Sequence, residues 1–314
     1  MLDASVIIVN YRSEDHVAEL LAWLSHKPQE RPAQIVIVDN TPERGLAARP
    51  ELGRSEVMYL PMERNIGFAA AVNAGLLEAG QRIAILLNPD ARPDPGCLSG
   101  LLGELDSTPE AAVAGPRLTP FHEGETEIPS ATLIEPNLKS ILLEYTALHR
   151  LVPGSRDWLR RHYFAELVDS PVDAAMVQGA CFAIVRSWSE RVGGFDTRFF
   201  LYWEETDFCR RVREQQGRVR YCPQLQCRHV GGASVEDESA ASRHYWRGFY
   251  AYLEKHRGKW YARGVRVLML IGVGAEYLIL RALGLWRRGR DPRLAADTES
   301  MRLRLRGQFL KSAR

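Results

Sequence analysis

Polar side chains that suit a metal ion follow one of the apolar runs of the chain. Asn88 and Asp90 flank Pro89 directly after the run Ile83–Leu87. Hard divalent cations such as Mg²⁺ and Mn²⁺ bind carboxylate and amide oxygens. Asn-Pro-Asp is equally typical of a plain turn after a strand, so that interpretation stays open. His229 could add a nitrogen ligand, which Mn²⁺ accepts better than Mg²⁺, although a lone histidine is also typical of a structural role.

Three carboxylates lie close together later in the chain, at Glu204, Glu205 and Asp207. A carboxylate can act as the general base that removes the proton of an attacking hydroxyl group. On a helix, Glu204 and Asp207 would share one face while Glu205 points elsewhere. The alternative is that these acids only stabilise the start of a helix against its dipole. The aromatic run 199–203 before them favours catalysis, because such side chains suit the wall of a binding site.

The hydrophobic pattern predicts the scaffold that positions these groups. Short β-branched runs alternate with helical patterns, which is typical of parallel strands joined by crossover helices. The runs are almost continuously apolar, so we expect strands that are buried on both faces by helices. The predicted strands are 6–9, 35–38, 57–60, 83–87, 218–222 and parts of 172–185. The predicted helices are one that follows Ser13 as its N-cap, 67–80, 138–151, 204–216 and 242–256.

Polar residues follow several of these strands at the point where each strand ends. Ligands bind outside the carboxyl ends of the strands in such sheets. The polar residues at these ends are Asn10, Tyr11, Asp39, Asn40, Asn65, Asn88 and Asp90. All of them fall at one edge of the predicted sheet, which indicates a ligand site there.

Composition is that of an ordinary globular protein. The 314 residues are 46% hydrophobic and 25% charged, enough for one large α/β domain with an appendage, and they exclude a fibrous or disordered chain. Five cysteines without CxxC spacing favour a reduced cytosolic protein over a disulfide framework. The N-terminus lacks the features of a signal peptide, which also predicts a cytosolic location.

The charge is distributed unevenly along the chain. Residues 243–314 hold 17 Lys and Arg against 5 Asp and Glu, a net charge of +12, whereas residues 1–242 hold 24 against 34, a net charge of −10. The apolar segment 265–286 is interrupted by Arg266, Glu276 and Arg281, which favours a helix that lies on a membrane surface, or on the protein itself, over a membrane span. Basic residues interleaved with aromatic ones are also found in nucleic-acid binders, but the acidic front of the chain would repel a polyanion, so we expect no nucleic-acid partner.

The ordered set of motifs resembles family-two glycosyltransferases, and most closely the rhamnosyltransferase-like enzymes of bacterial cell-wall and O-antigen synthesis. The resemblance covers roughly residues 4–235. The motifs that carry it are Val9-Asn10-Tyr11, Val38-Asp39-Asn40, Asn65-Ile66-Gly67-Phe68, Asn73, Leu87-Asn88-Pro89-Asp90, Gly179-Ala180, Gly193-Gly194-Phe195-Asp196, Phe199-Phe200 and Trp203-Glu204-Glu205-Thr206-Asp207.

The resemblance implies an α/β protein of the GT-A fold, with a mostly parallel central sheet flanked by helices and a helical C-terminal appendage. We expect a catalytic domain over 1–239, with a donor half of about 1–118 and an acceptor half of about 119–239, followed by a basic amphipathic region over 240–314.

The resemblance also assigns roles to the motif residues. Asp90 stands where the family has its metal-binding aspartates, with Asn88 nearby and His229 as a further ligand. The second acid of the Glu-Asp-x-Asp pattern acts as the base, and that position is Glu205 here; Glu204 and Asp207 remain alternatives. The residues implied for donor binding are Asn10, Tyr11, Asp39, Asn40, Asn65, Gly67, Asn73 and Asn88. Those implied for acceptor binding are Gly179, Ala180 and Trp203.

The expected function is inverting, Mg²⁺- or Mn²⁺-dependent transfer of a sugar, rhamnose from dTDP-rhamnose first, to a saccharide or polyprenyl-diphosphate-linked acceptor. UDP-linked sugars, as in galactofuranosyl- or N-acetylhexosaminyltransferases, are the alternative donors. Nucleotidyl transfer is disfavoured because no Gly-rich phosphate loop follows Val9. A non-enzymatic membrane-associated scaffold is the other alternative. We expect a cytoplasmic protein held peripherally on the anionic inner face of the cell membrane by residues 240–314, which could instead form a homodimer.

Overall fold

The computed structural model describes residues 2–27, 30–121, 129–146, 148–229 and 238–286. The chain divides into two compact units. The first, called the sheet unit here, comprises Met1–Glu135, Phe164–Phe200 and Glu204–Glu236. The second, called the helical unit, comprises Pro136–Tyr163, Leu201–Trp203 and Asp237–Arg314.

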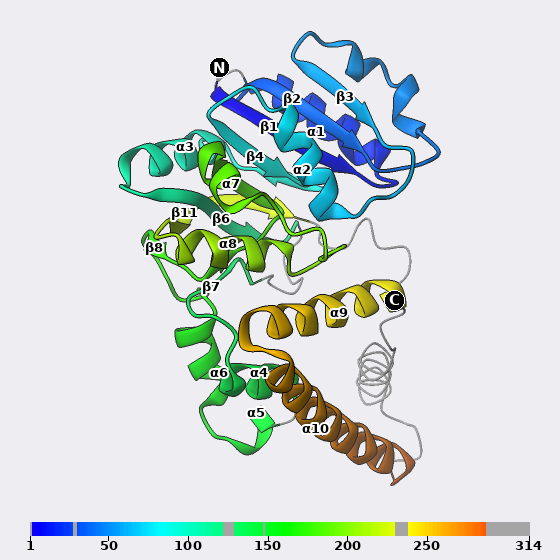
Figure 1. Cartoon of the computed structure of the whole chain (residues 1–314), viewed down its shortest axis with the longest axis vertical. Coiled ribbons are helices and arrows are strands. Elements are labelled where there is room, and N and C mark those ends of the chain that lie inside the picture. The colour runs from blue at the N-terminus through cyan, green and yellow to red at the C-terminus, as the bar shows by residue number, and fades with distance from the viewer. Residues whose placement is uncertain (1, 28–29, 122–128, 147, 230–237, 287–314) are drawn as a thin grey trace. The chain divides into compact units, whose positions relative to one another are not determined.

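A mixed sheet of nine strands forms the centre of the sheet unit (Figure 1). Its strand order is β3-β2-β1-β4-β10-β6-β11-β5, and β8 also pairs with β11. The strands are β1 (Leu2–Asn10), β2 (Pro32–Asp39), β3 (Val57–Pro61), β4 (Ile83–Leu87), β5 (Ala91–Pro93), β6 (Ala111–Thr119), β8 (Val172–Asp173), β10 (Cys181–Val185) and β11 (Arg218–His229). Neighbours among β1, β2, β3 and β4 run parallel, as do β6 and β11. The predicted mostly parallel α/β architecture is therefore present.

One strand departs from the parallel arrangement at the middle of the sheet. β10 pairs antiparallel with both β4 and β6, and Cys181 lies opposite Leu87. The predicted strand material of 172–185 is split into β8, β9 (Met176–Val177) and β10. β9 pairs with β7 (Ala131–Thr132) in a separate two-stranded sheet. The antiparallel placement of β10 sets the start of this strand beside the end of β4.

Helices of the sheet unit lie against these strands (Figure 1). They are α1 (Glu14–Ser25), α2 (Phe68–Glu78), α3 (Cys97–Ser107), α7 (Arg186–Val192) and α8 (Glu204–Glu214), with short 3-10 turns at Gly45–Ala48 and Pro50–Gly53. Ser13 is the N-cap residue of α1, as predicted, but its hydroxyl donates to the carbonyl of Tyr11 and makes no cap hydrogen bond to the helix. The Ser13 N–H is bound by the Asn10 side chain, which ties the helix start to the strand end.

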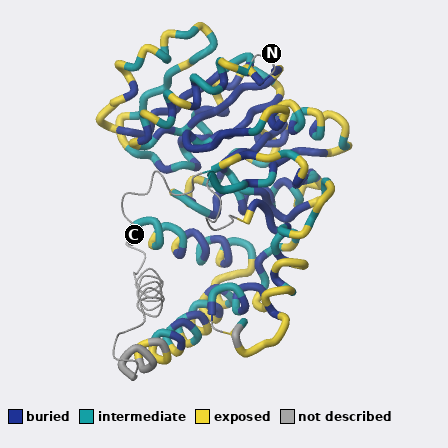
Figure 2. Tube along the Cα trace, turned by 180° about the vertical axis from the view of Figure 1, so that it is seen from behind, coloured by how far each residue is buried: buried dark blue, intermediate teal, exposed yellow. Residues whose placement is uncertain are grey.

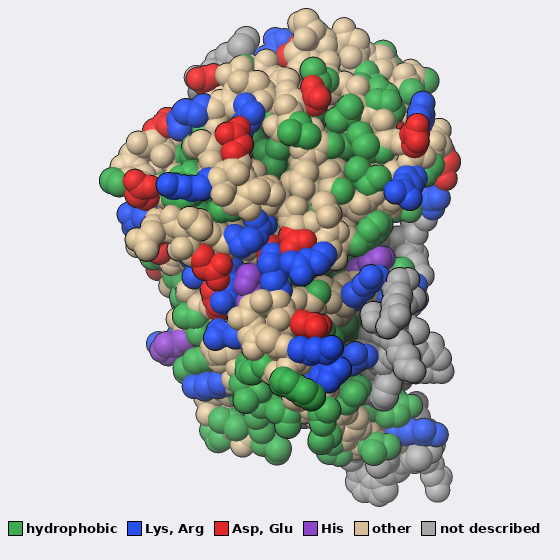
Figure 3. Space-filling view, viewed as in Figure 1, with side chains coloured by type: hydrophobic (Ala, Val, Ile, Leu, Met, Phe, Trp, Pro, Cys, Tyr) green, Lys and Arg blue, Asp and Glu red, His purple; other side chains and the backbone are tan. Residues whose placement is uncertain are grey.

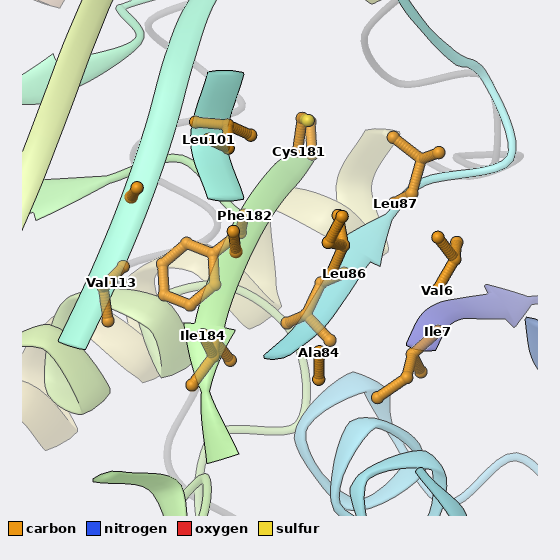
Figure 4. Close-up of a cluster of buried hydrophobic side chains, with 14 of the residues drawn as sticks. Val6, Ile7, Ala84, Leu86, Leu87, Leu101, Val113, Cys181, Phe182 and Ile184 are labelled. Atoms are coloured by element: carbon orange, nitrogen blue, oxygen red, sulfur yellow. The ribbon is translucent and has the colours of Figure 1, made fainter. Parts of the chain in front are cut away.

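The hydrophobic core fills the space between the sheet and its helices. Figure 2 shows the strands as the most deeply buried part of this unit. Val6, Ile85 and Phe182 have no exposed surface, and the aliphatic side chains of β1, β4 and β10 pack beside one another (Figure 4). Removing this much apolar surface from water supplies the main stabilisation of the unit. The core thereby fixes the strand ends that carry the polar motifs.

The helical unit consists of α4 (Leu138–Tyr145), α5 (Leu148–Leu151), α6 (Ser155–Trp158), a π-helical turn (Leu159–Tyr163), α9 (Glu238–Arg257) and α10 (Lys259–Trp286). The predicted helix over 138–151 is thus present in two pieces. Aromatic rings join α4 and α9, since the ring of Tyr145 lies 5.3 Å from that of Trp246 and 5.7 Å from that of Phe249. Residues 136–163 therefore cluster with the C-terminal helices.

Helix α10 has one buried and one exposed face. Ala262, Val265, Met269, Val273 and Glu276 are buried at intervals of three or four residues. The large apolar side chains of the other face are exposed: Val267, Leu268, Ile271, Leu278 and Ile279. Hydrophobic side chains gather on the part of the helical unit seen in Figure 3. Within the described residues, no helix has the length and apolarity needed to cross a bilayer.

Candidate active site

The ends of β1 and β2 are joined by a network centred on Asp39. These two strand ends lie opposite each other in register, with Asn10 beside Asp39. The Asn10 amide donates to Asp39 Oδ1 at 2.8 Å, and the Tyr59 hydroxyl donates to Asp39 Oδ2 at 2.6 Å. The Thr41 N–H also donates to Oδ1. Burial and the adjacent carboxylate raise the pKa of Tyr59, so its hydroxyl stays a donor.

Asp39 is fully buried, and Asn10 is as well. The structure therefore brings these two predicted donor-binding residues together, with the half-buried Tyr11 next to them. In the described conformation the Asp39 carboxylate holds the strand ends in place.

Asn40 and Asn65 lock the loop before α2. Asn40 Nδ2 donates to Asn65 Oδ1 at 2.9 Å, and the N–H groups of Ile66 and Gly67 donate to Asn40 and Asn65. Gly67 has a φ of +85°, and a Cβ there would lie 2.8 Å from the carbonyl oxygen of Phe200. Only glycine fits this position, since both the backbone conformation and the space exclude a side chain. The predicted donor-binding residues of this loop thus form one rigid element.

Asn73 connects α2 to the Gly-Gly-Phe-Asp turn. Its amide donates to the Phe195 carbonyl at 2.7 Å and accepts from the Phe195 N–H at 2.8 Å. Gly194, with a φ of +71°, approaches the same amide, and a Cβ there would lie 2.7 Å from Asn73 Oδ1. Asn73 therefore fixes the Gly-Gly-Phe-Asp turn to α2 in this structure. Its direct contact with the donor stays a prediction.

The predicted metal ligands come together at the end of β4. The pairing of β5 with β11 sets His229 opposite Ala91, the residue after Asp90. His229 Nε2 lies 3.3 Å from Asp90 Oδ1 and 3.5 Å from Asn88 Nδ2. Burial raises the pKa of Asp90, but the hydrogen bond and charge of His229 outweigh it and hold that pKa below its usual value. His229 Nδ1 is buried with no hydrogen-bond partner among the described residues.

This set is small for a metal site. Among the described residues there is no group of three or more His, Cys, Asp or Glu side chains that could hold an ion. The Asp90–His229 separation nevertheless suits a shared cation, because two neighbouring ligands of an octahedral ion at about 2.1 Å lie about 3 Å apart. A carboxylate and an imidazole would leave positions open for diphosphate oxygens. The residues present therefore fit a cation that is held jointly by protein and substrate.

Glu204 and Glu205 begin α8, and each has a buried carboxylate oxygen, Oε2, without a partner among the described residues. Burial, reinforced by the neighbouring Glu205, raises the pKa of Glu204 well above its usual value. Burial also raises the pKa of Glu205, against hydrogen bonds from its own N–H and that of Gly179. A buried carboxylate with a raised pKa binds a proton more strongly than an exposed one, which is the property that a general base needs.

Asp207 differs from the other two acids. It is fully buried and pairs with Arg211, whose Nε lies 2.7 Å from its Oδ2. Arg211 also donates to the carbonyls of Val192 and Gly194. Asp207 thus anchors α8 to the Gly-Gly turn, and these contacts give it a structural task.

Gly179 and Ala180 link the acids to the turn that carries Asp90. The Gly179 N–H donates to the Glu205 carboxylate. The Asn88 N–H donates to the Ala180 carbonyl at 2.9 Å. The turn that carries Asp90 and the start of α8 are therefore joined through two consecutive residues.

Trp203 belongs to the helical unit, where it is buried. Its ring lies 5.1 to 5.6 Å from those of Tyr245, Phe249 and Tyr252. Its indole N–H has no partner among the described residues. The faces of the ring thus pack on α9, and the acceptor role expected for Trp203 stays a prediction.

Several residues that the sequence analysis missed complete the site. Tyr59 and Thr41 bind Asp39, and Arg92 donates to carbonyls beside Asp90. His16 lies close enough to Asp90 to lower its pKa. The signal for Arg92 was an arginine two residues after Asp90, inside a strand whose residues are all buried.

The sequence of this chain is similar to those of known proteins. Residues 5–193 match the model of the family described as Glycosyl transferase family 2. The chain belongs to this family. It is a glycosyltransferase with a GT-A-like fold, as the resemblance of its motifs predicted.

Two curated relatives and one solved structure are similar to this glycosyltransferase. N-acetylglucosaminyl-diphospho-decaprenol L-rhamnosyltransferase of Mycobacterium tuberculosis is 25% identical over 274 residues, 82% of this chain and 86% of that protein. A low-salt glycan biosynthesis hexosyltransferase of Haloferax volcanii is 28% identical over 236 residues, 72% of this chain and 67% of that protein. A mannosyltransferase from Pyrobaculum calidifontis, solved with GDP-mannose and Mn²⁺, is 14% identical with a TM-score of 0.59, over 97% of this chain and 85% of that chain.

Proposed function

We propose that this glycosyltransferase is an inverting enzyme that uses a divalent cation and transfers a sugar from a nucleotide diphosphate to a saccharide hydroxyl. The observation that carries the proposal is the junction of two chemically distinct groups. The Asp90–His229 pair lies at the end of β4, and Ala180 and Gly179 connect it to the buried Glu205. One group suits a leaving diphosphate and the other suits an attacking hydroxyl.

Asp90 and His229 would hold Mg²⁺ or Mn²⁺, with Asn88 beside them. When bound, the cation would neutralise the negative charge that grows on the departing diphosphate. The pair is nearly buried, since Asp90 is 5% exposed, so its charge acts in a poorly solvated place. His229 Nε2 faces Asp90, which leaves Nδ1 as the second nitrogen available to orient the ring.

Glu205 would remove the proton of the acceptor hydroxyl as its oxygen attacks the anomeric carbon from the side opposite the diphosphate. The Gly179 N–H fixes one part of the carboxylate, and the unpartnered Oε2 remains to take the proton. Glu204, whose raised pKa favours its protonated form, would keep the negative charge beside Glu205 low. Asp207 would hold the helix, given its ion pair with Arg211.

The donor that we propose is dTDP-rhamnose. The Mycobacterium tuberculosis relative is a rhamnosyltransferase, and its similarity to this chain extends over most of both chains. Asn10, Tyr11 and Asp39 would bind the base and ribose, and the loop of Asn40, Asn65 and Gly67 the ribose and diphosphate, with Asn73 bracing that loop's helix. A UDP-linked sugar is the alternative donor.

The acceptor that we propose is a saccharide linked to a polyprenyl diphosphate, as the name of the same relative describes for that protein. Gly179, Ala180 and Trp203 are the proposed acceptor-side residues. Such an acceptor has its reactive head at a membrane surface, so the enzyme would work peripherally at the cytoplasmic leaflet.

The exposed face of α10 would provide the membrane contact. Val267, Leu268, Ile271, Leu278 and Ile279 are 42 to 64% exposed. From Gly264 to Ile279, about 22 Å of helix, no exposed position is charged. The exposed basic residues Arg257, Lys259, Arg263 and Arg281 flank this stretch. An apolar face bordered by cations matches a bilayer that contains anionic lipid.

Transfer is tested with purified protein, dTDP-rhamnose or UDP-sugars, and a short N-acetylglucosaminyl-diphospho-polyprenol. We expect a product with inverted anomeric configuration from one donor, and loss of product in EDTA or with Asp90→Ala. Asp94→Ala, which removes an exposed partner of Arg228, is the matched control and should remain active. Full turnover in EDTA would disprove the cation, and absence of transfer from every donor would favour a non-enzymatic scaffold.

Membrane contact is tested by sedimentation with vesicles of phosphatidylcholine with and without phosphatidylglycerol. We expect binding to the anionic vesicles and its loss in the double variant Ile271→Glu/Leu278→Glu. Leu77→Glu is the control, since Leu77 is 83% exposed on α2 of the sheet unit. Unchanged vesicle binding by the double variant would refute this face as the contact. A fall from dimer to monomer in that variant, without vesicle binding by either protein, would identify a homodimer interface instead.

A further inference from the structure

Arg92 is a buried arginine whose guanidinium grips the backbone on both sides of Asp90. Its Nη1 donates to the Pro89 carbonyl at 2.6 Å and to the Ala91 carbonyl at 2.8 Å. The Pro89 carbonyl belongs to the peptide bond before Asp90, and the Ala91 carbonyl belongs to the peptide bond between Ala91 and Arg92. Only 9% of Arg92 is exposed.

The other terminal nitrogen connects this turn to α1. Arg92 Nη2 donates to Glu19 Oε2 at 2.9 Å and contacts the His16 carbonyl at 3.4 Å. Helix α1 starts from the Asn10 loop at the donor side of the site. The guanidinium therefore joins the turn of Asp90 to the element that follows the first strand.

The turn of Asp90 is held at its ends by the sheet, since the Asn88 N–H donates to the Ala180 carbonyl at 2.9 Å and Ala91 pairs with His229 across β5 and β11. The turn is closed by one hydrogen bond from the Ala91 N–H to the Asn88 carbonyl at 3.0 Å. Pro89 presets one backbone angle, but Asp90 remains free to adjust its own. Two charge-assisted hydrogen bonds from a rigid guanidinium are stronger than neutral ones, and they hold the peptide before Asp90 and the peptide after Ala91.

We propose that Arg92 is a positioning residue that holds the Asp90 carboxylate in the orientation needed to share a divalent cation with His229. This inference rests on the cation proposed above. Arg92 itself would touch neither cation nor substrate. It would act through the peptide before Asp90 and the peptide after Ala91, which together fix the conformation of the turn from which the Asp90 side chain projects.

Electrostatics and positioning predict opposite effects of removing Arg92. A positive charge near a cation site repels the cation, so loss of the charge alone would tighten cation binding. Loss of the clamp would weaken it, since partners that orient a metal ligand are worth about 10–100-fold in affinity. The sign of the change therefore identifies the role.

The test uses the full chain and measures Mn²⁺ binding from the spectroscopic signal of free Mn²⁺, without donor or acceptor. The variants are Arg92→Met and Arg92→Lys. Arg220→Met is the matched control, because Arg220 is also 9% exposed, lies in the same sheet on β11, and pairs with Glu104 and Asp173 away from Asp90. Thermal unfolding of each variant reports any general loss of stability.

We expect Mn²⁺ to bind about 10–100-fold more weakly to Arg92→Met. Arg92→Lys should lie between it and the parent protein, because an ammonium group cannot reproduce the fork. Arg220→Met should bind Mn²⁺ like the parent even if it is less stable. Tighter or unchanged binding by both Arg92 variants, or equal weakening by Arg220→Met, would overturn the inference. If the parent protein binds no Mn²⁺, the cation proposal fails and this inference fails with it, whereas binding that the Arg92 variants retain refutes only the positioning role.

Discussion

Three acids at the start of one helix have three different surroundings. Glu205 receives a hydrogen bond from Gly179 and keeps one free buried oxygen, whereas Asp207 is neutralised by Arg211. Glu204 is buried beside Glu205 and has its pKa raised by both effects. The partners of each carboxylate, rather than its position in the motif, separate the proposed base from its neighbours.

Replacement of Glu205 by glutamine should therefore lower kcat by about 10²–10⁴-fold, the usual contribution of a general base. Glutamine keeps the shape and the hydrogen bond from Gly179 but cannot take a proton. The dissociation constant of the nucleotide donor, measured by titration, should hardly change. A larger loss of kcat in Glu204→Gln, with Glu205→Gln still active, would move the role to Glu204.

The raised pKa of Glu205 has a consequence for the pH dependence of transfer. A base acts only when it is ionised, and burial makes ionisation harder. The acid limb of the kcat–pH profile should therefore lie above 4.5, the ordinary value for glutamate. The free energy of unfolding changes with pH in the opposite direction. These buried carboxylates stabilise the folded state while they are protonated, and this stabilisation is lost as pH rises through their folded pKa. An acid limb at or below 4.5 would contradict the assignment.

At the scale of elements, the helical unit depends on a close approach between α9 and the segment 201–203. A Cβ at Gly248 would lie 2.8 Å from the Tyr202 carbonyl oxygen and 3.0 Å from Trp203 Cδ1. Both residues have positive φ values, +68° for Tyr202 and +74° for Trp203, which are unusual for bulky side chains. Tight packing on α9 is what holds this strained backbone in place.

Gly248→Ala should accordingly destabilise the protein by about 1–3 kcal/mol, the usual cost of overpacking. The matched control is Gly264→Ala on α10, where a Cβ would meet nothing within 4 Å. That variant should be neutral or up to about 1 kcal/mol more stable, because alanine is the better helix former. Chemical denaturation of both variants distinguishes them, and equal stability would show that the α9 contact adapts without cost.

Elements could be predicted from the sequence where the signal is local. The apolar runs of β1, β2, β3 and β4 located the strands, and their polar ends located the site, because strand ends of a parallel sheet share an edge. The ion pair of Asp207 with Arg211 has the four-residue spacing of neighbours on a helix, but the sequence analysis did not assign it.

Long-range pairing was not readable in this way. His229 reaches Asn88, 141 residues away, only because β5 pairs with β11. Its assignment as a ligand came from resemblance. The antiparallel position of β10 was likewise missed, since the periodicity of a strand does not record the direction of its neighbours. Residues such as Tyr59 and Arg92 gained their tasks from partners that no local pattern names.

At the scale of the whole molecule, the basic residues beyond α10 and the apolar face of α10 lie in different parts of the sequence. Residues 287–314, which lie outside the described residues, carry 9 Lys and Arg against 3 Asp and Glu, a net charge of +6. Each cation contributes about 1 kcal/mol near an anionic surface and is screened by salt. In the membrane contact proposed above, the aliphatic face of α10 would add apolar burial, which salt does not screen.

Deletion of residues 287–314 should therefore reduce the salt sensitivity of binding to anionic vesicles while leaving a component that needs Ile271 and Leu278. Co-sedimentation at several salt concentrations measures both components. This deletion is a better test than removal of all residues after His256, because the latter also removes Val265, Met269 and Val273 from the packed helical unit. Loss of all binding on deletion of 287–314 would show that α10 has no part in it.

The five cysteines of this protein are all reduced and buried. Burial raises the pKa of Cys209 and Cys222 to about 12, so the thiolate that reacts with alkylating reagents is scarce in the folded state. A maleimide dye should consequently ignore the native thiols until the sheet unit opens. Ile271→Cys would then be the one reactive site of the folded protein, and an environment-sensitive dye attached there would report entry into lipid without removal of a single native cysteine.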